Sequence, residues 1–225
     1  MAAAPTSRNP TIRCHSGELI PRQRQSTRAL RTGTDSYIQW MVKHPHLTEF
    51  HSRAEWLYAG LLEGNAKVIS YVPQPFTLQV GKRRYTPDCY VLEGAERRVV
   101  ELKPRGEFDE VLRGPLEAFF AIQGMTFDVV SNESVYERAI EAETWLDIVR
   151  VLHLNREMNT VVAEYDVLDL ITPGQARRFD DLVDPGDRPS SRLREVAALR
   201  LLQRGLLKGD FTKKPLNYDT ELTRT

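Results

Sequence analysis

Apolar and polar residues alternate with two different periods along the chain. In the first period, apolar residues recur every three or four positions, which predicts an amphipathic helix over 46–63. The pair Gly64-Asn65, typical of helix ends, follows it. The pattern then changes to short runs rich in β-branched and aromatic residues. These runs predict strands over 67–72, 76–80, 84–92 and 98–103.

The next patterns complete a mixed α/β region. The turn-forming pairs Gly81-Lys82 and Glu93-Gly94 predict hairpins between the strands. A helix over 108–123 and a strand over 126–131 follow, and Ser134 with Glu137 has the spacing of a capping box that opens a helix to about residue 152. The order of helix, β-meander, helix, strand and helix indicates a mixed α/β domain.

Composition divides the chain into three parts. Residues 1–35 are rich in Arg, Thr, Ser and Pro and have no period, which predicts a basic N-terminal arm that becomes ordered on a partner. Residues 36–155 carry the α/β pattern. In 156–225, the helix-breaking runs Thr172-Pro173-Gly174 and Asp184-Pro185-Gly186 interrupt the chain. A short helical pattern over 174–183 lies between them, and a second over 190–204 follows, before a short LLKGDF segment. We expect a small helical C-terminal domain there, for which a winged-helix module is one interpretation.

Charge and composition narrow the class of protein. The 225 residues carry 31 basic and 31 acidic side chains, but residues 1–33 hold six arginines against one acid, whereas 34–172 hold 14 basic and 22 acidic residues. The hydrophobic fraction of 41% excludes wholesale disorder, and no apolar run approaches a membrane span. The start of the chain lacks the apolar segment of a secretory signal, and there are only two cysteines, so we expect a cytoplasmic protein.

Two carboxylates and an amine form the strongest chemical pattern. Asp88 follows Pro87 within a predicted strand, and Glu101-Leu102-Lys103 ends the next one, so a hairpin would place Asp88 beside Glu101. Hard Mg²⁺ prefers one or two carboxylates plus phosphate and water oxygens, and the Leu102 carbonyl is available as a further ligand. Lys103 returns to the face of Glu101, where its amine can act on a water or on phosphate charge. The pattern therefore predicts metal-dependent hydrolysis of a phosphodiester.

A simpler interpretation exists for the same residues. Glu101 and Lys103 can form a cross-strand surface pair, with Asp88 a turn acid. The context favours the site, since Glu55 lies on the helix just before the meander. The basic run Lys82-Arg83-Arg84 lies in the hairpin before Asp88, where it would contact phosphate or form a solvated turn.

Four short motifs, in order, resemble those of a known family. They are Ser52-Arg53-Ala54-Glu55, Gln74-Pro75, Tyr85-Thr86-Pro87-Asp88 and Glu101-Leu102-Lys103-Pro104. The stretch from about His51 to Pro104 resembles the PD-(D/E)xK nuclease superfamily and, more narrowly, the TnsA endonuclease subunit of heteromeric Tns-type bacterial transposons. Cys89 departs from the aromatic residue that commonly follows the aspartate in that family.

The resemblance implies a restriction-endonuclease-like core, which is a mixed central sheet flanked by helices, and a specific activity. Glu55, Asp88 and Glu101, with the Leu102 carbonyl, would bind Mg²⁺, for which Mn²⁺ can substitute, and Lys103 would act on the nucleophilic water. Gln74 would shape the edge of the site, or the Gln-Pro pair merely ends a strand. The protein would then cut one strand of DNA at transposon ends in a prokaryotic cytoplasm.

The resemblance also implies partners. A TnsB-like DDE transposase would cut and join the other strand, and a TnsC-like AAA+ ATPase regulator would dock on the C-terminal domain. Two alternatives stay open at this point: a stand-alone repair or restriction-type nuclease, and a non-catalytic adaptor that recruits the ATPase. The zero net charge favours a subunit whose DNA is held largely by a partner, since nucleases that grip DNA alone usually carry a basic excess.

Overall fold

A four-stranded mixed sheet forms the centre of the larger part of the molecule in this computed structural model, which describes residues 11–14, 19–23 and 35–225. Its order is β4-β7-β8-β9, and only β8 and β9 pair in parallel. The four strands are β4 (Val68–Pro73), β7 (Cys89–Glu93), β8 (Glu96–Lys103) and β9 (Thr126–Ser131). Gly94 adopts a φ of 58° in the turn that joins β7 to β8, a conformation that glycine adopts without steric cost.

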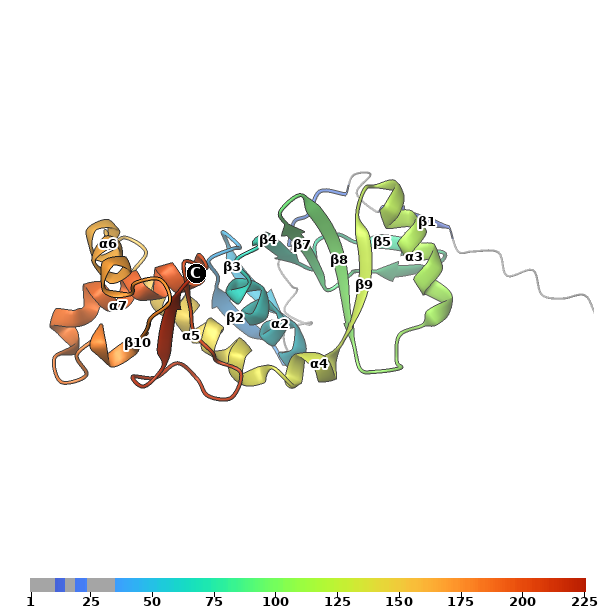
Figure 1. Cartoon of the computed structure of the whole chain (residues 1–225). Coiled ribbons are helices and arrows are strands. Elements are labelled where there is room, and N and C mark those ends of the chain that lie inside the picture. The colour runs from blue at the N-terminus through green and yellow to red at the C-terminus, as the bar shows by residue number, and fades with distance from the viewer. Residues whose placement is uncertain (1–10, 15–18, 24–34) are drawn as a thin grey trace, which may run out of the picture.

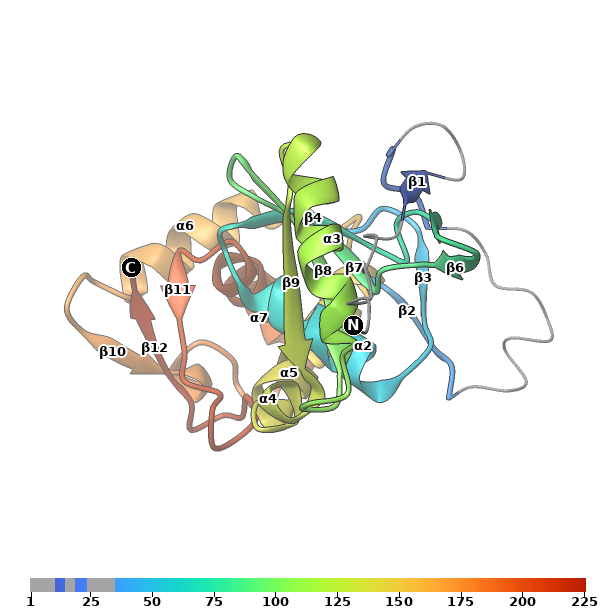
Figure 2. The ribbon, with the colours of Figure 1, turned by 90° about the vertical axis from the view of Figure 1, so that its right-hand side faces the viewer.

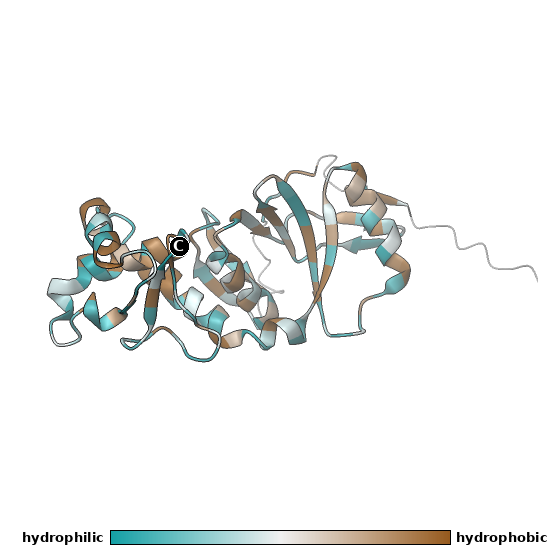
Figure 3. Ribbon diagram, in the orientation of Figure 1, coloured by the Kyte–Doolittle hydropathy of each residue, from teal (hydrophilic) through white to brown (hydrophobic). Residues whose placement is uncertain are grey.

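Helices cover both faces of this sheet (Figure 1). One face packs against α2 (Arg53–Gly64) and α5 (Ala139–Leu154), and the other against α3 (Glu110–Ile122). In Figure 3, β8 changes from hydrophilic residues at its start to hydrophobic ones further along, where Val99 and Val100 are fully buried on opposite faces. The short helix α4 (Asn132–Tyr136) joins β9 to α5.

Two smaller β-structures flank the central sheet. A three-stranded sheet, β1-β5-β6, packs on the α3 side and is visible in Figure 2. Its strands are β1 (Ile12–Cys14), β5 (Leu78–Val80) and β6 (Arg83–Tyr85). A hairpin of β2 (Tyr37–Trp40) and β3 (Leu47–Phe50) precedes α2.

The C-terminal part has its own core. It contains α6 (Val161–Leu170), α7 (Arg188–Gln203), the 3-10 turn η1 (Phe179–Asp181) and a small sheet ordered β10-β12-β11. The strands of this sheet are β10 (Ala176–Arg178), β11 (Leu207–Lys208) and β12 (Glu221–Arg224). Helix α5 contributes side chains to both cores. Leu146 packs with the central sheet, and Ile148 packs with the C-terminal residues. The chain is therefore mixed α/β, as predicted, and none of the helices in the described residues is long and apolar enough to cross a membrane.

Several predicted elements are wrong. Residues 47–50 form a strand rather than the start of a helix, because they pair with 37–40; the helix begins at Arg53, after the N-cap Ser52. The strand predicted over 84–92 is two strands in different sheets. They are separated at Pro87, which cannot donate to a ladder.

Errors also occur in the second half. The cap of α4 is Ser131, whose Oγ accepts a hydrogen bond from the Ser134 N–H, and α4 and α5 are separate helices. Residues 176–178, predicted to be helical, pair instead with 221–223, a partner too distant in sequence for a local pattern to indicate. The helix over 161–170 was not predicted, because apolar residues occur on its exposed face as well as its buried one.

The N-terminal arm is described only in part. Residues 1–10, 15–18 and 24–34 lie outside the described residues, and so does most of the arm predicted over 1–35. Within it, Ile12–Cys14 pair with β5, so this short stretch is ordered on the chain itself rather than on a partner.

Candidate active site

Asp88 and Glu101 face each other at the edge of the β7–β8 hairpin. Cys89 pairs with Val100 in the ladder, so the residue before Cys89 lies opposite the residue after Val100. Asp88 Oδ2 accepts a hydrogen bond of 2.7 Å from the Leu102 backbone N–H, which fixes the carboxylate across the hairpin. The proximity predicted from the hairpin is therefore confirmed.

Lys103 and Tyr85 hold the Glu101 carboxylate. The Lys103 Nζ lies 3.0 Å from Oε1, and the Tyr85 hydroxyl donates to Oε2 at 2.7 Å. Glu101 is only 3% exposed, whereas Lys103 reaches the surface. Leu102 lies on the opposite side of β8, in the core formed with α2, as strand alternation predicts.

Glu55 reaches the same region from the first turn of α2. Its Oε1 accepts from the Ser52 hydroxyl at 3.0 Å, and its Oε2 accepts from the His51 N–H at 3.2 Å. Ser52 in turn caps the helix by accepting from the Glu55 N–H. The Ser52–Glu55 motif thus has a structural function as a helix cap, which also orients the carboxylate.

Gln74 connects Glu55 with Asp88. Its side-chain amide donates to Glu55 Oε2 at 2.5 Å, and its backbone N–H donates to the Asp88 carbonyl at 2.9 Å. A small cavity of about 10 Å³, lined by both Glu55 and Asp88, lies beside these contacts and has room for roughly one water-sized species. Gln74 therefore lies within the group of predicted site residues.

The electrostatics reflect three acids gathered around one amine. Burial, reinforced by Glu101 and Glu55, raises the pKa of Asp88 well above its usual range. Burial also raises the pKa of Glu55, against the opposing effect of its hydrogen bonds from His51 and Ser52. Burial alone would lower the pKa of Lys103, but the three carboxylates outweigh it and raise that pKa.

The oxygen donors suit a hard cation, although they do not form a closed ligand shell. Among the described residues, no three His, Cys, Asp or Glu side chains form a group that could hold a metal ion. The carboxylates instead accept hydrogen bonds from their own chain. Mg²⁺ needs only one or two carboxylates when phosphate and water supply the other ligands, and a cation beside three acids that share one amine would favour their ionised forms.

The predicted basic residues lie on the neighbouring hairpin. Lys82, Arg83 and Arg84 are exposed, and none of them forms an ion pair with another described residue. Arg83 lies on the same strand face as Tyr85, the donor to Glu101, and Arg84 lies on the opposite face. Arg84 shares a cross-strand row with Gln79 and Arg13, so β1 adds a fourth basic side chain to this small sheet.

Sequence reasoning missed two site residues. Tyr85 belongs to the Tyr85-Thr86-Pro87-Asp88 motif, which gave it no role of its own, but its hydroxyl orients Glu101. Gln23 was not considered, yet its side-chain amide donates to Gln74 Oε1 at 3.0 Å. No local pattern could have indicated a contact across 51 residues.

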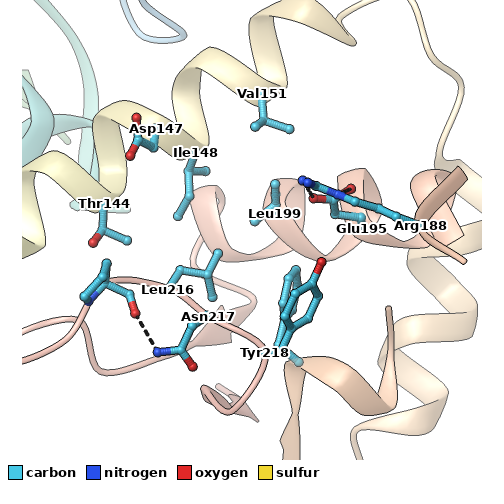
Figure 4. Close-up of a pocket in the computed structure, with 12 residues that line it drawn as sticks. Thr144, Asp147, Ile148, Val151, Arg188, Glu195, Leu199, Leu216, Asn217 and Tyr218 are labelled. Carbon is cyan, nitrogen blue, oxygen red and sulfur yellow. Dashed lines mark hydrogen bonds and ion pairs between the residues drawn. The ribbon is translucent and has the colours of Figure 1, made fainter. Parts of the chain in front are cut away.

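A larger cavity than the one beside Glu55 lies between α5, α7 and the loop before β12 (Figure 4). It measures about 290 Å³ and is walled mainly by apolar side chains, including Ile148, Leu199 and Leu216. Its charged pair, Arg188 and Glu195, is joined at 2.7 Å. None of the predicted catalytic residues lines it.

Comparison with known proteins adds no relative: no family model and no curated protein matches this sequence.

Proposed function

We propose that this protein is a divalent-metal-dependent DNA endonuclease, the TnsA-like subunit of a heteromeric transposase that hydrolyses one strand at transposon ends. The observation that carries the proposal is the convergence of Asp88 and Glu101 across one hairpin, with Lys103 on Glu101 and Glu55 on the adjoining helix. The motif resemblance supplies the family, and the geometry supports the chemistry.

In this proposal each residue has a stated role. Glu55, Asp88 and Glu101 would hold Mg²⁺ or Mn²⁺, with the Leu102 carbonyl as a further ligand, and Tyr85 and Gln74 would orient the carboxylates. The bound cation would act as a Lewis acid on the scissile phosphate and make water a better nucleophile. Lys103 would orient that water or stabilise charge on the phosphate. Arg83, on the strand face of Tyr85, would contact the DNA backbone, with Lys82 and Arg84 beside it.

The proposed architecture follows the same family. The central sheet with α2, α5 and α3 would be a restriction-endonuclease-like core over 36–155, and the C-terminal helices with their small sheet a winged-helix-like domain over 156–225. That domain would dock a TnsC-like AAA+ ATPase, while a TnsB-like DDE transposase holds the DNA end. These assignments rest on the motif resemblance.

The test is a reconstituted cleavage reaction. The full chain is combined with its TnsB-like transposase, Mg²⁺ and duplex DNA carrying a transposon end, and the cut strands are resolved. We expect a nick in one strand, lost in Glu55→Ala, Asp88→Ala and Lys103→Ala. The surface variant Glu143→Ala, which removes only an exposed ion pair with Arg53, should cut normally. Unimpaired nicking by all three site variants would contradict the proposal.

The same reaction separates the two alternatives. Cutting without any transposase would favour a stand-alone repair or restriction-type nuclease. A chain that binds the ATPase but neither binds Mn²⁺ nor cuts DNA would be a non-catalytic adaptor.

A further inference from the structure

Gln74 has an unusual backbone that its site contacts hold in place. It is the only non-glycine among the described residues with a positive φ, at 41°. Such a conformation is strained for a residue with a side chain and persists only where surrounding contacts impose it. Here the backbone N–H is bonded to the Asp88 carbonyl and the side chain to Glu55, so the strained residue bridges two of the proposed metal ligands.

The chemistry of Glu55 fixes the direction of the hydrogen bonds beyond it. Gln74 presents its NH₂ group to Glu55 Oε2, which accepts the hydrogen bond. Its Oε1 therefore faces Gln23, which must donate through Nε2, at 3.0 Å. Gln23 Nε2 also donates to the Glu49 carbonyl at 2.6 Å, which leaves Gln23 Oε1 to accept from the Glu49 N–H at 3.4 Å. The donors thus run in one direction, from Gln23 through Gln74 to Glu55.

The N-terminal segment that carries Gln23 is tied to the site at a second point. The Arg22 backbone N–H donates to the Pro75 carbonyl at 2.8 Å, one residue beyond Gln74. Leu19 packs against the core on the α3 side of the sheet. Residues 19–23 therefore lie against both residues of the Gln74-Pro75 pair.

We propose that Gln23 is a positioning residue of the site: through Gln74 it fixes the Glu55 carboxylate, so that residues 19–23 form part of the catalytic unit. The inference rests on the proposed function, because its effect is exerted on a proposed metal ligand. A residue that acts through a ligand in this way typically changes metal affinity by about 10- to 100-fold.

The test uses two variants of similar length to glutamine. Gln23→Glu keeps the acceptor for Glu49 but cannot donate to Gln74, and Gln23→Met removes both functions. The control is Gln175→Ala, which removes an exposed glutamine in the C-terminal part. Mn²⁺ binding to the full chain is measured by calorimetry, together with the Mg²⁺ dependence of nicking and the melting temperature without metal.

We expect both Gln23 variants to bind Mn²⁺ about 10- to 100-fold more weakly and to need correspondingly more Mg²⁺ for half-maximal nicking. The nicking rate at saturating Mg²⁺ should recover most of its wild-type value, and Gln175→Ala should match the wild type. A lower melting temperature with unchanged Mn²⁺ affinity would show that Gln23 only anchors the segment, and would overturn the inference alone. A wild-type chain that neither binds Mn²⁺ nor nicks DNA would overturn the proposed function as well.

Discussion

Helix α2 has a carboxylate near each end, half-buried at Glu55 and buried at Glu63, and the two ends differ in their countercharge. At the C-terminal end, Glu63 is fully buried. Its Oε1 accepts hydrogen bonds from the Val42 and Lys43 backbone N–H groups at 3.1 and 3.0 Å and from the Tyr71 hydroxyl at 3.1 Å. The Lys43 ammonium donates to the carbonyls of Leu62 and Asn65, which end the helix. Glu63 thus has three hydrogen-bond donors and one nearby amine, and Glu93, which also acts on that amine, is paired with Arg98.

At the N-terminal end, three carboxylates share one ammonium. Glu55, Asp88 and Glu101 gather around Lys103. Burial raises the pKa of Glu63 as it does that of Glu55, so a buried acid with a raised pKa does not by itself mark a functional site. The distinguishing feature is that three acids share one amine at the N-terminal end, where a bound cation would favour the ionised carboxylates.

The largest expected difference between the two ends is in DNA cleavage. Asp88→Asn removes a charge that the proposed cation needs, so nicking should fall by at least about 100-fold. Glu63→Gln keeps an acceptor in a network remote from the reaction and should cut at the wild-type rate per folded molecule. Rates are measured on transposon-end DNA in the reconstituted reaction. Equal losses in both variants would mean that the two ends do not differ in function.

A matched pair of tyrosines sharpens the comparison. Tyr71 and Tyr85 each donate a hydroxyl to a buried glutamate. Tyr71→Phe should lower the free energy of unfolding by about 1.5–3 kcal/mol, the range for hydrogen bonds to charged groups, without slowing nicking. Tyr85→Phe should instead lower nicking by about 10- to 100-fold, since it releases a proposed ligand. Urea unfolding measures the stability of both variants, and the reconstituted reaction measures their nicking rates. Slower nicking by Tyr71→Phe, with normal nicking by Tyr85→Phe, would contradict the proposed difference between the two ends of α2.

A smaller effect is expected on the basic hairpin. Arg83 shares the strand face of Tyr85, and Arg84 lies on the other face. Arg83→Ala should weaken DNA binding uniformly across sequences and reduce the slope of log K against log salt by about 1. Arg84→Ala is the control on the same strand and should change the slope less. Binding to short duplexes over a range of salt concentrations measures both; a larger effect from Arg84 would place the DNA on the opposite face.

The smallest effect concerns pH and the structural end of α2. Burial lowers the pKa of Lys43 to about 8, against the opposing pull of Glu63 and Glu93. Between about pH 8 and the ordinary lysine pKa of 10.5, the unfolded chain therefore binds more protons than the folded chain, and this group makes stability rise with pH. The free energy of unfolding of the wild type, minus that of Lys43→Met, should increase across this window. A flat difference across this window would contradict the lowered pKa of Lys43.

The sequence was most informative where chemistry and short-range pairing coincide. Asp88 and Glu101 belong to one hairpin with a two-residue turn, so their proximity followed from strand register alone. The position of Lys103 on the same strand face as Glu101 followed from the alternation of side chains along β8. These inferences needed no knowledge of the rest of the fold.

The elements and contacts that could not be predicted depend on pairing between residues far apart in the sequence. Residues 47–50 carry apolar spacing compatible with a helix, but their pairing with 37–40 makes them a strand. Residues 176–178 depend on β12, and Gln23 depends on contacts with Glu49 and Gln74. In each case the partner lies outside any local window, so neither propensity nor period could reveal it.

Metal binding tests the central claim most directly. Mn²⁺ is titrated by calorimetry into the wild type, Asp88→Asn and Glu63→Gln, with folding of each variant checked by its melting temperature. The account predicts that the wild type and Glu63→Gln bind Mn²⁺ with the same affinity, and that Asp88→Asn loses this binding. Equal binding by the wild type and Asp88→Asn would contradict the assignment of the three carboxylates to a metal site.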